Sequence, residues 1–287
     1  MKVIRSDVLG FCMGVRRAVD MAVKAADSCS PVYSLGPVIH NPEVLSALES
    51  RGVLPINELE IPENLENCSV IVRAHGISPK TENKLRGMGC RIIDATCPKV
   101  KASQLKAEEL AEAGYFIFLA GEAEHAEIKG ILGYAKDGFC VTTECAEEAE
   151  REAALLYKKR GSVKTALLGQ TTICEDEYSA ASEAIKKYFP DLKIINTICA
   201  ATADRQKSLR ELLERTEAVV IAGGRESANT RRLLLIAQES GKPCVLAENA
   251  GEIPDSFKNF KTVGLCAGAS TPDSVIDEIE RELLRIC

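Results

Sequence analysis

The sequence predicts an α/β protein made of three similar units with mainly parallel sheets, related by pseudo-threefold symmetry. One observation behind this prediction is a steady alternation, along 287 residues, of short runs rich in Val, Ile and Leu with charged stretches of helical period. Another is that each third of the chain has one junction between an apolar run and a helix that carries a cysteine. No long linker or low-complexity tract separates the thirds, which indicates units that pack tightly.

The predicted strands are the short apolar runs, and the predicted helices fill the stretches between them. We expect strands at residues 31–35, 70–73, 91–94, 115–120, 165–168, 192–195, 218–222, 244–247 and 262–266. We expect helices between them, for example at residues 100–113, 175–188, 204–217 and 272–286. Because such repeats form parallel sheets, the strand-to-helix turns should gather along one edge of each sheet, where ligands bind.

Four helix starts are marked by a capping or polar residue followed by proline: Asn41-Pro42, Ser78-Pro79, Cys97-Pro98 and Thr271-Pro272. A polar side chain before the first turn can accept a hydrogen bond from an amide that has no partner within the helix. Proline at the first helical position loses no hydrogen bond. These pairs therefore predict helices that begin near residues 42, 79, 98 and 272.

The bulk composition restricts the classes of partner. A chain with 46% hydrophobic and 27% charged residues is typical of a globular protein, and its net charge of −6 disfavours nucleic acid or a membrane surface as a partner. No apolar stretch approaches the roughly 18 residues of a membrane span, and Met1-Lys2-Val3-Ile4-Arg5 lacks the apolar core of a signal peptide. We therefore expect a cytoplasmic protein.

Twelve cysteines require an explanation in a reducing compartment, where disulfides are disfavoured. The chain has no Cys-x-x-Cys pair, which argues against a zinc ribbon and against a clustered ferredoxin-type site. Cys12, Cys97 and Cys199 each end an apolar run just before a predicted helix. A helix N-terminus favours the thiolate that metals bind, so these three predict an iron-sulfur centre with one open position, and three capped core cysteines are the alternative.

The other nine cysteines are interpreted as structural or incidental, since a buried thiol usually behaves as a small apolar side chain. Five lie in or beside apolar strands: Cys68, Cys90, Cys140, Cys244 and Cys266. Three lie near predicted helix ends or loops, and the last ends the chain: Cys29, Cys145, Cys174 and Cys287.

The three histidines follow apolar runs at turns, which favours a shared site over three separate packing roles. They are His40, His75 and His125. Two glycine-containing loops, at residues 223–229 and 268–272, add Ser227, Asn229 and Ser270, which suit a phosphate group or simple helix capping.

Glu127 and Thr171 are the candidates for proton transfer. Glu127 follows His125 by two residues and can act as an acid near neutral pH only if burial or a nearby anion raises its pKa. Thr171, in Gln170-Thr171-Thr172, could position a water molecule or a hydroxyl group. A solvated glutamate and a capping threonine are the alternatives.

Several separated motifs together resemble the family of 4-hydroxy-3-methylbut-2-enyl diphosphate reductase, the terminal enzyme of the methylerythritol phosphate route to isoprenoids. The resemblance covers essentially the whole chain. In order, the motifs are Gly10-Phe11-Cys12, Ala74-His75-Gly76, Asp94-Ala95-Thr96-Cys97-Pro98, Gln170-Thr171-Thr172, Thr202-Ala203-Asp204-Arg205-Gln206 and Ala267-Gly268-Ala269-Ser270.

The resemblance implies one [4Fe-4S] cluster, held by Cys12, Cys97 and Cys199, with its fourth iron open to the substrate hydroxyl group. It implies three α/β units around this central iron-sulfur cluster: residues 14–97, 98–196 and 197–287, the last joined by the N-terminal strand 1–13. It implies Glu127 as the proton donor. The side chains that match its substrate-binding residues are His40, His75, His125, Thr171, Ser227, Asn229 and Ser270. Many relatives have a second serine where this chain has Ala228, which removes one hydroxyl donor.

The implied reaction is reductive dehydroxylation of (E)-4-hydroxy-3-methylbut-2-enyl diphosphate to isopentenyl diphosphate and dimethylallyl diphosphate. The electrons would come one at a time from a partner such as ferredoxin or flavodoxin, because the sequence shows no convincing flavin or nicotinamide fingerprint. Two alternatives remain: a three-cysteine dehydratase of the quinolinate synthase type, which consumes no electrons, and a non-catalytic iron-sulfur sensor.

Overall fold

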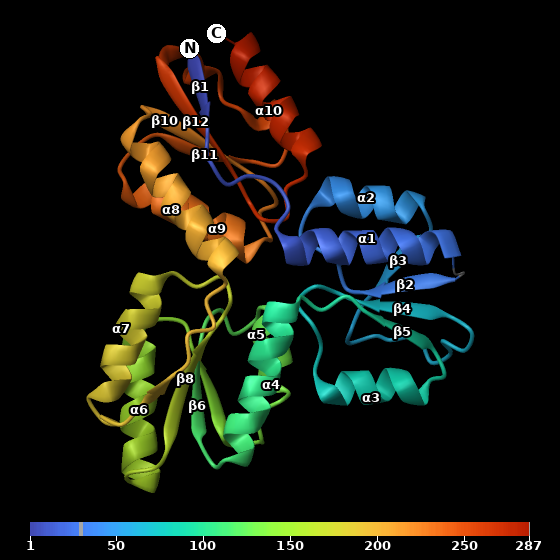
Figure 1. The fold of residues 1–287 in the computed structure, drawn as a ribbon, viewed down its shortest axis with the longest axis vertical. Helices are drawn as coiled ribbons and strands as arrows, with labels where there is room; N and C mark the ends of the chain where they lie inside the picture. Colours follow the sequence, from blue (N-terminus) through green and yellow to red (C-terminus); the bar gives the residue numbers. More distant parts are fainter. Residues whose placement is uncertain (29–30, 287) are drawn as a thin grey trace. The chain divides into compact units, whose positions relative to one another are not determined.

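A computed structural model describes residues 1–28 and 31–286 (Figure 1). The described residues form three four-stranded sheets with helices packed against them, which confirms the predicted α/β fold with parallel sheets. They divide into two compact units. Unit 1 comprises Met1–Asp27, Pro37–Val53 and the described residues from Ala200 on, and unit 2 comprises the described residues of Ser28–Gly36 together with Leu54–Cys199.

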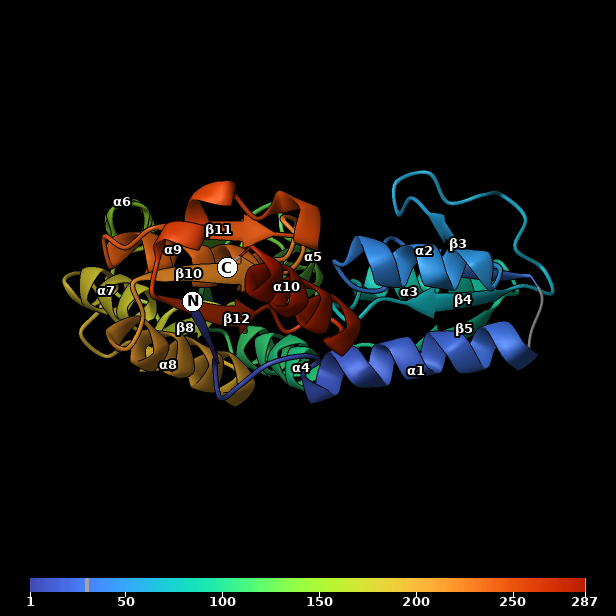
Figure 2. The same cartoon turned by 90° about the horizontal axis from the view of Figure 1, so that it is seen from above.

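The sheet of unit 1 has the strand order β1 (Lys2–Arg5), β12 (Thr262–Ala267), β10 (Ala218–Ala222), β11 (Cys244–Ala247). Alternate residues of a strand point to opposite faces. Ala218, Val220 and Ala222 pack with α10 (Asp273–Arg285), while α8 (Ala200–Glu214) and α9 (Ala228–Glu239) cover the other face (Figures 1 and 2). Two short 3-10 helices, Ala250–Glu252 and Asp255–Asn259, connect β11 to β12.

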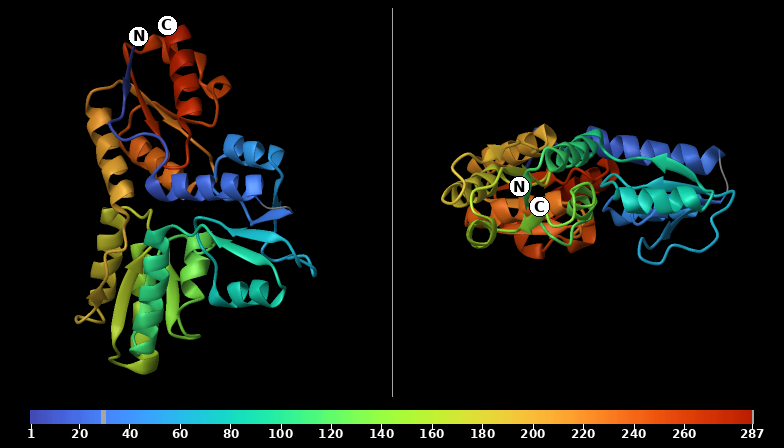
Figure 3. Two further views of the ribbon diagram at one scale, coloured as in Figure 1. Left: turned by 45° about the vertical axis from the view of Figure 1, so that its right-hand side comes forward. Right: turned by 90° about the horizontal axis from the view of Figure 1, so that it is seen from below.

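The first strand of the chain completes the sheet formed by its last third. β1 pairs in parallel with β12, Lys2 opposite Thr262 and Arg5 opposite Leu265. The N-terminus therefore lies close to the end of α10, as Figure 3 shows. The helices α1 (Met13–Ser28) and α2 (Pro42–Ser50) also belong to unit 1, apart from Ser28.

Unit 2 contains the other two sheets. One has the order β3 (Val53–Ile56), β2 (Val32–Leu35), β4 (Ser69–Val72), β5 (Arg91–Asp94), and Leu85 of α3 (Pro79–Gly87) joins its core. The other has the order β7 (Cys140–Thr143), β6 (Phe116–Ala120), β8 (Thr165–Gly169), β9 (Lys193–Ile194).

Helices cover both faces of the β7-β6-β8-β9 sheet. Phe118 and Leu167 face α6 (Ala146–Arg160) and α7 (Glu175–Lys186). Ile117 and Leu168 face α4 (Pro98–Glu112) and α5 (Ala126–Leu132). Figure 1 shows α4 and α5 on one face of this sheet and α6 and α7 on the other. This double burial explains why its central strands are continuous apolar runs without polar alternation.

Three of the four proline-marked helix starts are confirmed, while the starts of α10 and α8 differ from the prediction. Proline is the first helical residue at positions 42, 79 and 98, and the side chains of Asn41 and Ser78 accept capping hydrogen bonds from Val44 N and Thr81 N. α10 begins one residue later than predicted, because Pro272 is itself the N-cap residue. α8 begins at Ala200, one turn before the predicted 204, since the alanines of Ala200-Ala201 favour helix.

The strands expected from apolar runs did not include β1, β3 and β7, although the family resemblance implied an N-terminal strand. All three have four residues, and β3 contains Pro55, which weakens a strand prediction. The domain bounds 14–97, 98–196 and 197–287 stay a prediction. Every helix among the described residues is too short or too polar to cross a bilayer.

Candidate active site

Glu127 lies in the first turn of α5 with its carboxylate turned into unit 2, where it contacts Thr171. The Thr171 backbone N–H donates to Glu127 Oε1 at 2.6 Å, and the Thr171 hydroxyl donates to Oε2 at 2.8 Å. Both side chains are buried, Glu127 with only 2% of its surface exposed. The alternative of a solvated first-turn glutamate is therefore wrong.

Burial raises the pKa of Glu127 to about 7, while its hydrogen bonds with Thr171 act in the opposite direction. Desolvation dominates because a charged carboxylate inside the protein loses its hydration. An acid role near neutral pH requires a raised pKa, and Glu127 fulfils this requirement. A carboxyl group with a pKa near 7 is protonated in about half of the molecules at neutral pH and can release its proton to a neighbour.

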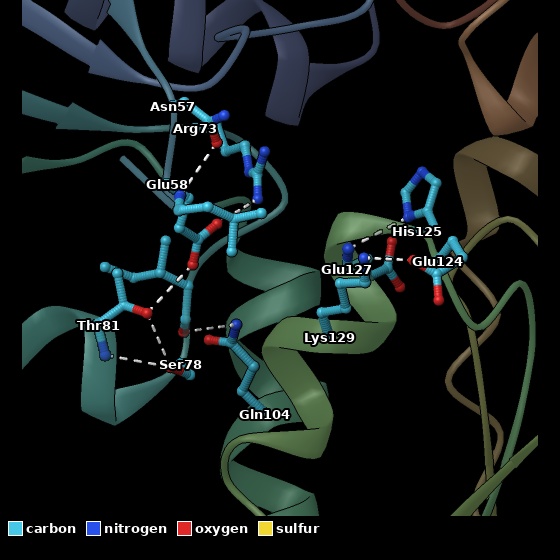
Figure 4. Close-up of polar contacts among 12 residues, drawn as sticks. Asn57, Glu58, Arg73, Ser78, Thr81, Gln104, Glu124, His125, Glu127 and Lys129 are labelled. Carbon is cyan, nitrogen blue, oxygen red and sulfur yellow. Dashed lines mark hydrogen bonds and ion pairs between the residues drawn. The ribbon is translucent and has the colours of Figure 1, made fainter. Parts of the chain in front are cut away.

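His125 connects Glu127 to the loop that follows β4. It is the N-cap residue of α5, and its Nδ1 accepts a hydrogen bond from Glu127 N at 3.2 Å (Figure 4). Its ring meets the ring of His75 edge to face, with centroids 5.1 Å apart. Both imidazoles are half-buried, which suits side chains that contact a ligand entering from solvent.

Cys97 is held beside the His75 loop. It is the N-cap residue of α4, and its backbone N–H donates to the carbonyl oxygen of Ala74 at 2.9 Å. Its side chain makes no capping hydrogen bond to the helix, so the alternative of a capping role is not supported for Cys97. Pro98 follows at the first helical position, as predicted.

Cys199 is held beside Thr171, the partner of Glu127. Its backbone N–H donates to the Thr171 carbonyl oxygen at 3.0 Å, and it directly precedes α8. Unit 2 therefore links five of the predicted site residues by direct contacts, in the order His75, His125, Glu127, Thr171, Cys199. Cys97 joins them through Ala74, the residue directly before His75.

Unit 1 brings the other predicted residues together. The backbone N–H of Cys12 donates to Ala269 O at 3.1 Å, and the hydroxyl of the next residue, Ser270, donates to the carbonyl oxygen of His40 at 3.1 Å. Cys12 directly precedes α1. A Cβ at Gly224 would lie 2.6 Å from His40 O, so only glycine allows the loop of Ser227 to approach so closely.

Asn229 is the strongest indication of a ligand in unit 1. It is 5% exposed, and neither its Oδ1 nor its Nδ2 has a hydrogen-bond partner among the described residues. Leaving a buried amide unpaired costs about 1–3 kcal/mol, so a ligand that pairs with it would recover this free energy. Asn229 lies in the first turn of α9, where the backbone N–H groups also favour an anion.

Ser227 is the N-cap residue of α9, and its Oγ accepts from Thr230 N at 3.4 Å. The capping alternative is thus correct for Ser227, although a long hydrogen bond of this kind still allows its hydroxyl to donate to a ligand. Ala228, the first residue of α9, is 3% exposed.

The structural interpretation of the other cysteines agrees with their environments. Burial raises the pKa of Cys140 to about 12 and that of Cys266 to about 11, which opposes the thiolate form that a metal requires. Burial also raises the pKa of Cys90 and of Cys244. Cys145 and Cys174 are N-cap residues of α6 and α7, as expected for helix ends. Cys29 and Cys287 lie outside the described residues.

Two polar residues, the buried Gln170 and the half-buried Thr172, were not predicted as site residues, although the sequence contains them in a motif. Gln170 is completely buried, and its Oε1 accepts from Glu122 N at 3.0 Å. The Thr172 hydroxyl and Gln170 Nε2 have no partner among the described residues. The signal that could have identified them is their position, because both belong to a polar stretch that directly follows β8, a strand buried at every residue.

A model of the LytB protein family matches residues 3–284. The chain belongs to the LytB family. Two LytB relatives named 4-hydroxy-3-methylbut-2-enyl diphosphate reductase are those of Treponema denticola, 43% identical over 99% of both chains, and Aquifex aeolicus, 38% identical over 99% of this chain and 96% of the relative.

Solved LytB-type structures agree with the fold. The E-1-hydroxy-2-methyl-but-2-enyl-4-diphosphate reductase from Plasmodium falciparum is 25% identical, covers 98% of this chain and 87% of its own, and has a TM-score of 0.90. A structure described as (E)-4-hydroxy-3-methyl-but-2-enyl diphosphate reductase, the terminal enzyme of the non-mevalonate pathway, is 37% identical over 99% and 100% of the two chains, with a TM-score of 0.70. These relatives agree with the family resemblance in the sequence and give no support to a dehydratase or a sensor.

Proposed function

We propose that this LytB protein reduces (E)-4-hydroxy-3-methylbut-2-enyl diphosphate to isopentenyl diphosphate and dimethylallyl diphosphate. The observation that carries the proposal is the environment of Glu127, a buried acid with a pKa near 7. It bonds Thr171, whose carbonyl oxygen accepts the Cys199 N–H, and its own N–H donates to His125, whose ring meets His75. An acid in that place can protonate a hydroxyl group that leaves as water.

The cofactor is one [4Fe-4S] cluster, with Cys12, Cys97 and Cys199 as ligands. The three cysteines fit such a group because each is half-buried, directly precedes a helix and has its backbone N–H fixed by a loop that carries other site residues. Three thiolates are soft ligands that suit iron and leave one metal position open. When bound, the cluster would supply electrons and a Lewis-acidic iron for the substrate hydroxyl group.

The diphosphate is assigned to His40, His75, His125, Ser227, Asn229 and Ser270. Imidazole N–H groups, hydroxyls, an amide and the N-terminus of α9 are donors that suit phosphate oxygens. Anchoring the diphosphate would fix the allylic alcohol at the other end of the substrate and so reduce the entropy that the reaction must lose.

Thr171 relays the proton. Its hydroxyl lies 2.8 Å from Glu127 Oε2, and a hydroxyl can accept a proton from the acid on one side while it donates to the substrate on the other. Since a carboxyl group with a pKa near 7 recovers its proton readily at neutral pH, Glu127 can serve in every turnover.

The electrons are assigned to a one-electron carrier such as ferredoxin or flavodoxin, and the cytoplasm is the compartment where such carriers stay reduced.

The test of the proposed reaction is anaerobic turnover of the allylic diphosphate by the iron-loaded protein, with a low-potential reductant present or omitted. We expect both C5 diphosphates only when the reductant is present. Conversion without reductant would favour a dehydratase, and no conversion at full iron load would remove the proposal.

Asn229→Ala should weaken diphosphate binding, because its amide is buried and ready to donate to a charged oxygen. A hydrogen bond to a charged group is worth about 1.5–3 kcal/mol, so KM should rise about 10- to 100-fold while kcat changes less. Asn249→Ala is the matched control, since Asn249 is exposed in the same unit, where its side chain caps a short 3-10 helix and donates to Glu252. Steady-state kinetics of both variants check the prediction, and equal KM values would contradict it.

A further inference from the structure

Arg205 is a buried cation. The acceptors of its hydrogen bonds in the described part of the chain are all main-chain oxygen atoms. It lies on α8 with 2% of its surface exposed. Its Nη1 donates to Val8 O at 3.1 Å and to Ala267 O at 2.8 Å, and its Nη2 donates to Gly10 O at 2.9 Å. Burial lowers its pKa, but arginine begins so high that the guanidinium stays charged.

Two of these three carbonyl groups belong to the segment that carries Cys12. Residues 6–12 connect β1 to α1 without regular secondary structure, and backbone N–H groups at the two ends of this segment donate to other segments, Ser6 N to Leu265 O and Cys12 N to Ala269 O. Ser208, one turn after Arg205 on α8, holds the start of the segment, because its Oγ bonds Ser6 Oγ at 2.7 Å and accepts from Asp7 N at 2.9 Å. One face of α8 therefore fixes the segment from Ser6 to Gly10.

The third carbonyl group links the same guanidinium to the loop of Ser270. Ala267 ends β12, and the loop after it supplies Ala269 O, which accepts the Cys12 N–H at 3.1 Å. Arg205 thus joins the two segments that meet at Cys12. Gly10 makes the close fit possible, because it has φ +72° and a Cβ there would lie 2.5 Å from Asp273 Oδ1.

We propose that Arg205 is a positioning residue: its guanidinium holds residues 8–10 against the end of β12 so that Cys12 stays in place as a metal ligand. This inference rests on the proposed function for the role of Cys12. A segment without secondary structure would otherwise lose conformational entropy when the metal binds Cys12. The three hydrogen bonds to the Arg205 guanidinium already order the segment in the metal-free protein, so metal binding loses less entropy.

The test combines hydrogen exchange with iron release on the full, iron-loaded chain. In Arg205→Gln, amides in the peptide that covers residues 6–12 should exchange about ten times faster than in the wild type, while peptides of α6 and α7 in unit 2 stay unchanged. Loss of iron to a ferrous chelator should be several times faster. Arg205→Lys keeps the charge and some of the donors, so its exchange and iron loss should be slower than in Arg205→Gln. If Arg205→Gln does not fold, Arg205→Lys is compared directly with the wild type.

Arg5→Gln is the matched control, since Arg5 lies on β1 of the same unit but pairs on the surface with Asp277 and Glu280. It should change neither readout. Unchanged exchange in residues 6–12 of the Arg205 variants would overturn the inference, and so would an equal rise throughout the chain, because positioning is a local effect. Iron that Cys12→Ser retains in full would instead contradict the proposed ligand role, while the exchange measurement would still judge Arg205.

Discussion

Replacing Cys97 by serine should abolish both the iron centre and the reduction of the allylic diphosphate. Serine presents a harder oxygen donor with a much higher pKa than a thiol, so it is a poor ligand for iron in a sulfur-rich site. We expect anaerobically reconstituted wild-type protein to contain about four irons per chain, and Cys97→Ser to retain well under half of that. Turnover should fall by more than about 100-fold, as iron analysis, visible absorption and product assays would show.

Two other cysteines make this prediction specific. Cys244→Ser changes a thiol on β11 whose pKa burial has raised, and Cys145→Ser changes an exposed N-cap residue that directly precedes a helix, as Cys97 does. Both variants should keep their iron and their activity. Iron loss of the same size in all three variants would mean that ligand cysteines had been separated wrongly from structural ones.

Cys145 and Cys174 also show how far sequence reasoning could reach. A cysteine directly before a helix was the local signal for Cys12, Cys97 and Cys199, but Cys145 and Cys174 occupy the same position before α6 and α7. Local pattern therefore could not separate the two groups, and the resemblance to a family did. In the structure, the backbone N–H groups of Cys12, Cys97 and Cys199 each bind a carbonyl group in a loop of other site residues. These acceptors are Ala269 O, Ala74 O and Thr171 O.

The long apolar strands and the proline-marked helices were predictable because their signals are local. β10, for example, is buried at every residue, and Pro79 follows the capping residue Ser78. β1 was not predicted as a strand from its residues because its stability comes from pairing with β12, more than 250 residues away. Contacts between distant segments do not produce a periodic pattern of apolar residues in either segment, so such patterns cannot predict them.

The burial of Glu127 was another property that the sequence could not give. Its neighbours Glu124 and Lys129 are exposed, and the acid-rich segment from Glu122 to Glu127 is typical of a solvated helix start. Only the position of Thr171, brought beside α5 by the pairing of β6 with β8, shows why one glutamate of this segment turns inward. The same applies to Arg205, whose three acceptors come from two distant parts of the chain.

Glu127→Gln should keep diphosphate binding and lose most of the turnover. Glutamine can still accept the Thr171 N–H but cannot supply a proton, and loss of a general acid typically costs about 100- to 10,000-fold in rate. In the wild type, kcat should fall as pH rises above about 7, because the protonated form of Glu127 is the active one. Full activity of Glu127→Gln near neutral pH would remove Glu127 as the proton donor.

Protein stability offers a second measure of the same carboxyl group that needs no turnover. Folding raises the pKa of Glu127 from 4.5 to about 7, so between these values the folded chain holds a proton that the unfolded chain releases. The free energy of unfolding should therefore fall as pH rises from 4.5 to 7, by about 3 kcal/mol for this group, and change little from it above that range. Glu127→Gln should remove this decrease, so the variant should gain stability over the wild type between pH 5 and pH 8 in urea unfolding. A constant difference between the two proteins across that range would mean that Glu127 titrates near its ordinary value, and an acid of that strength would be almost fully ionised at neutral pH.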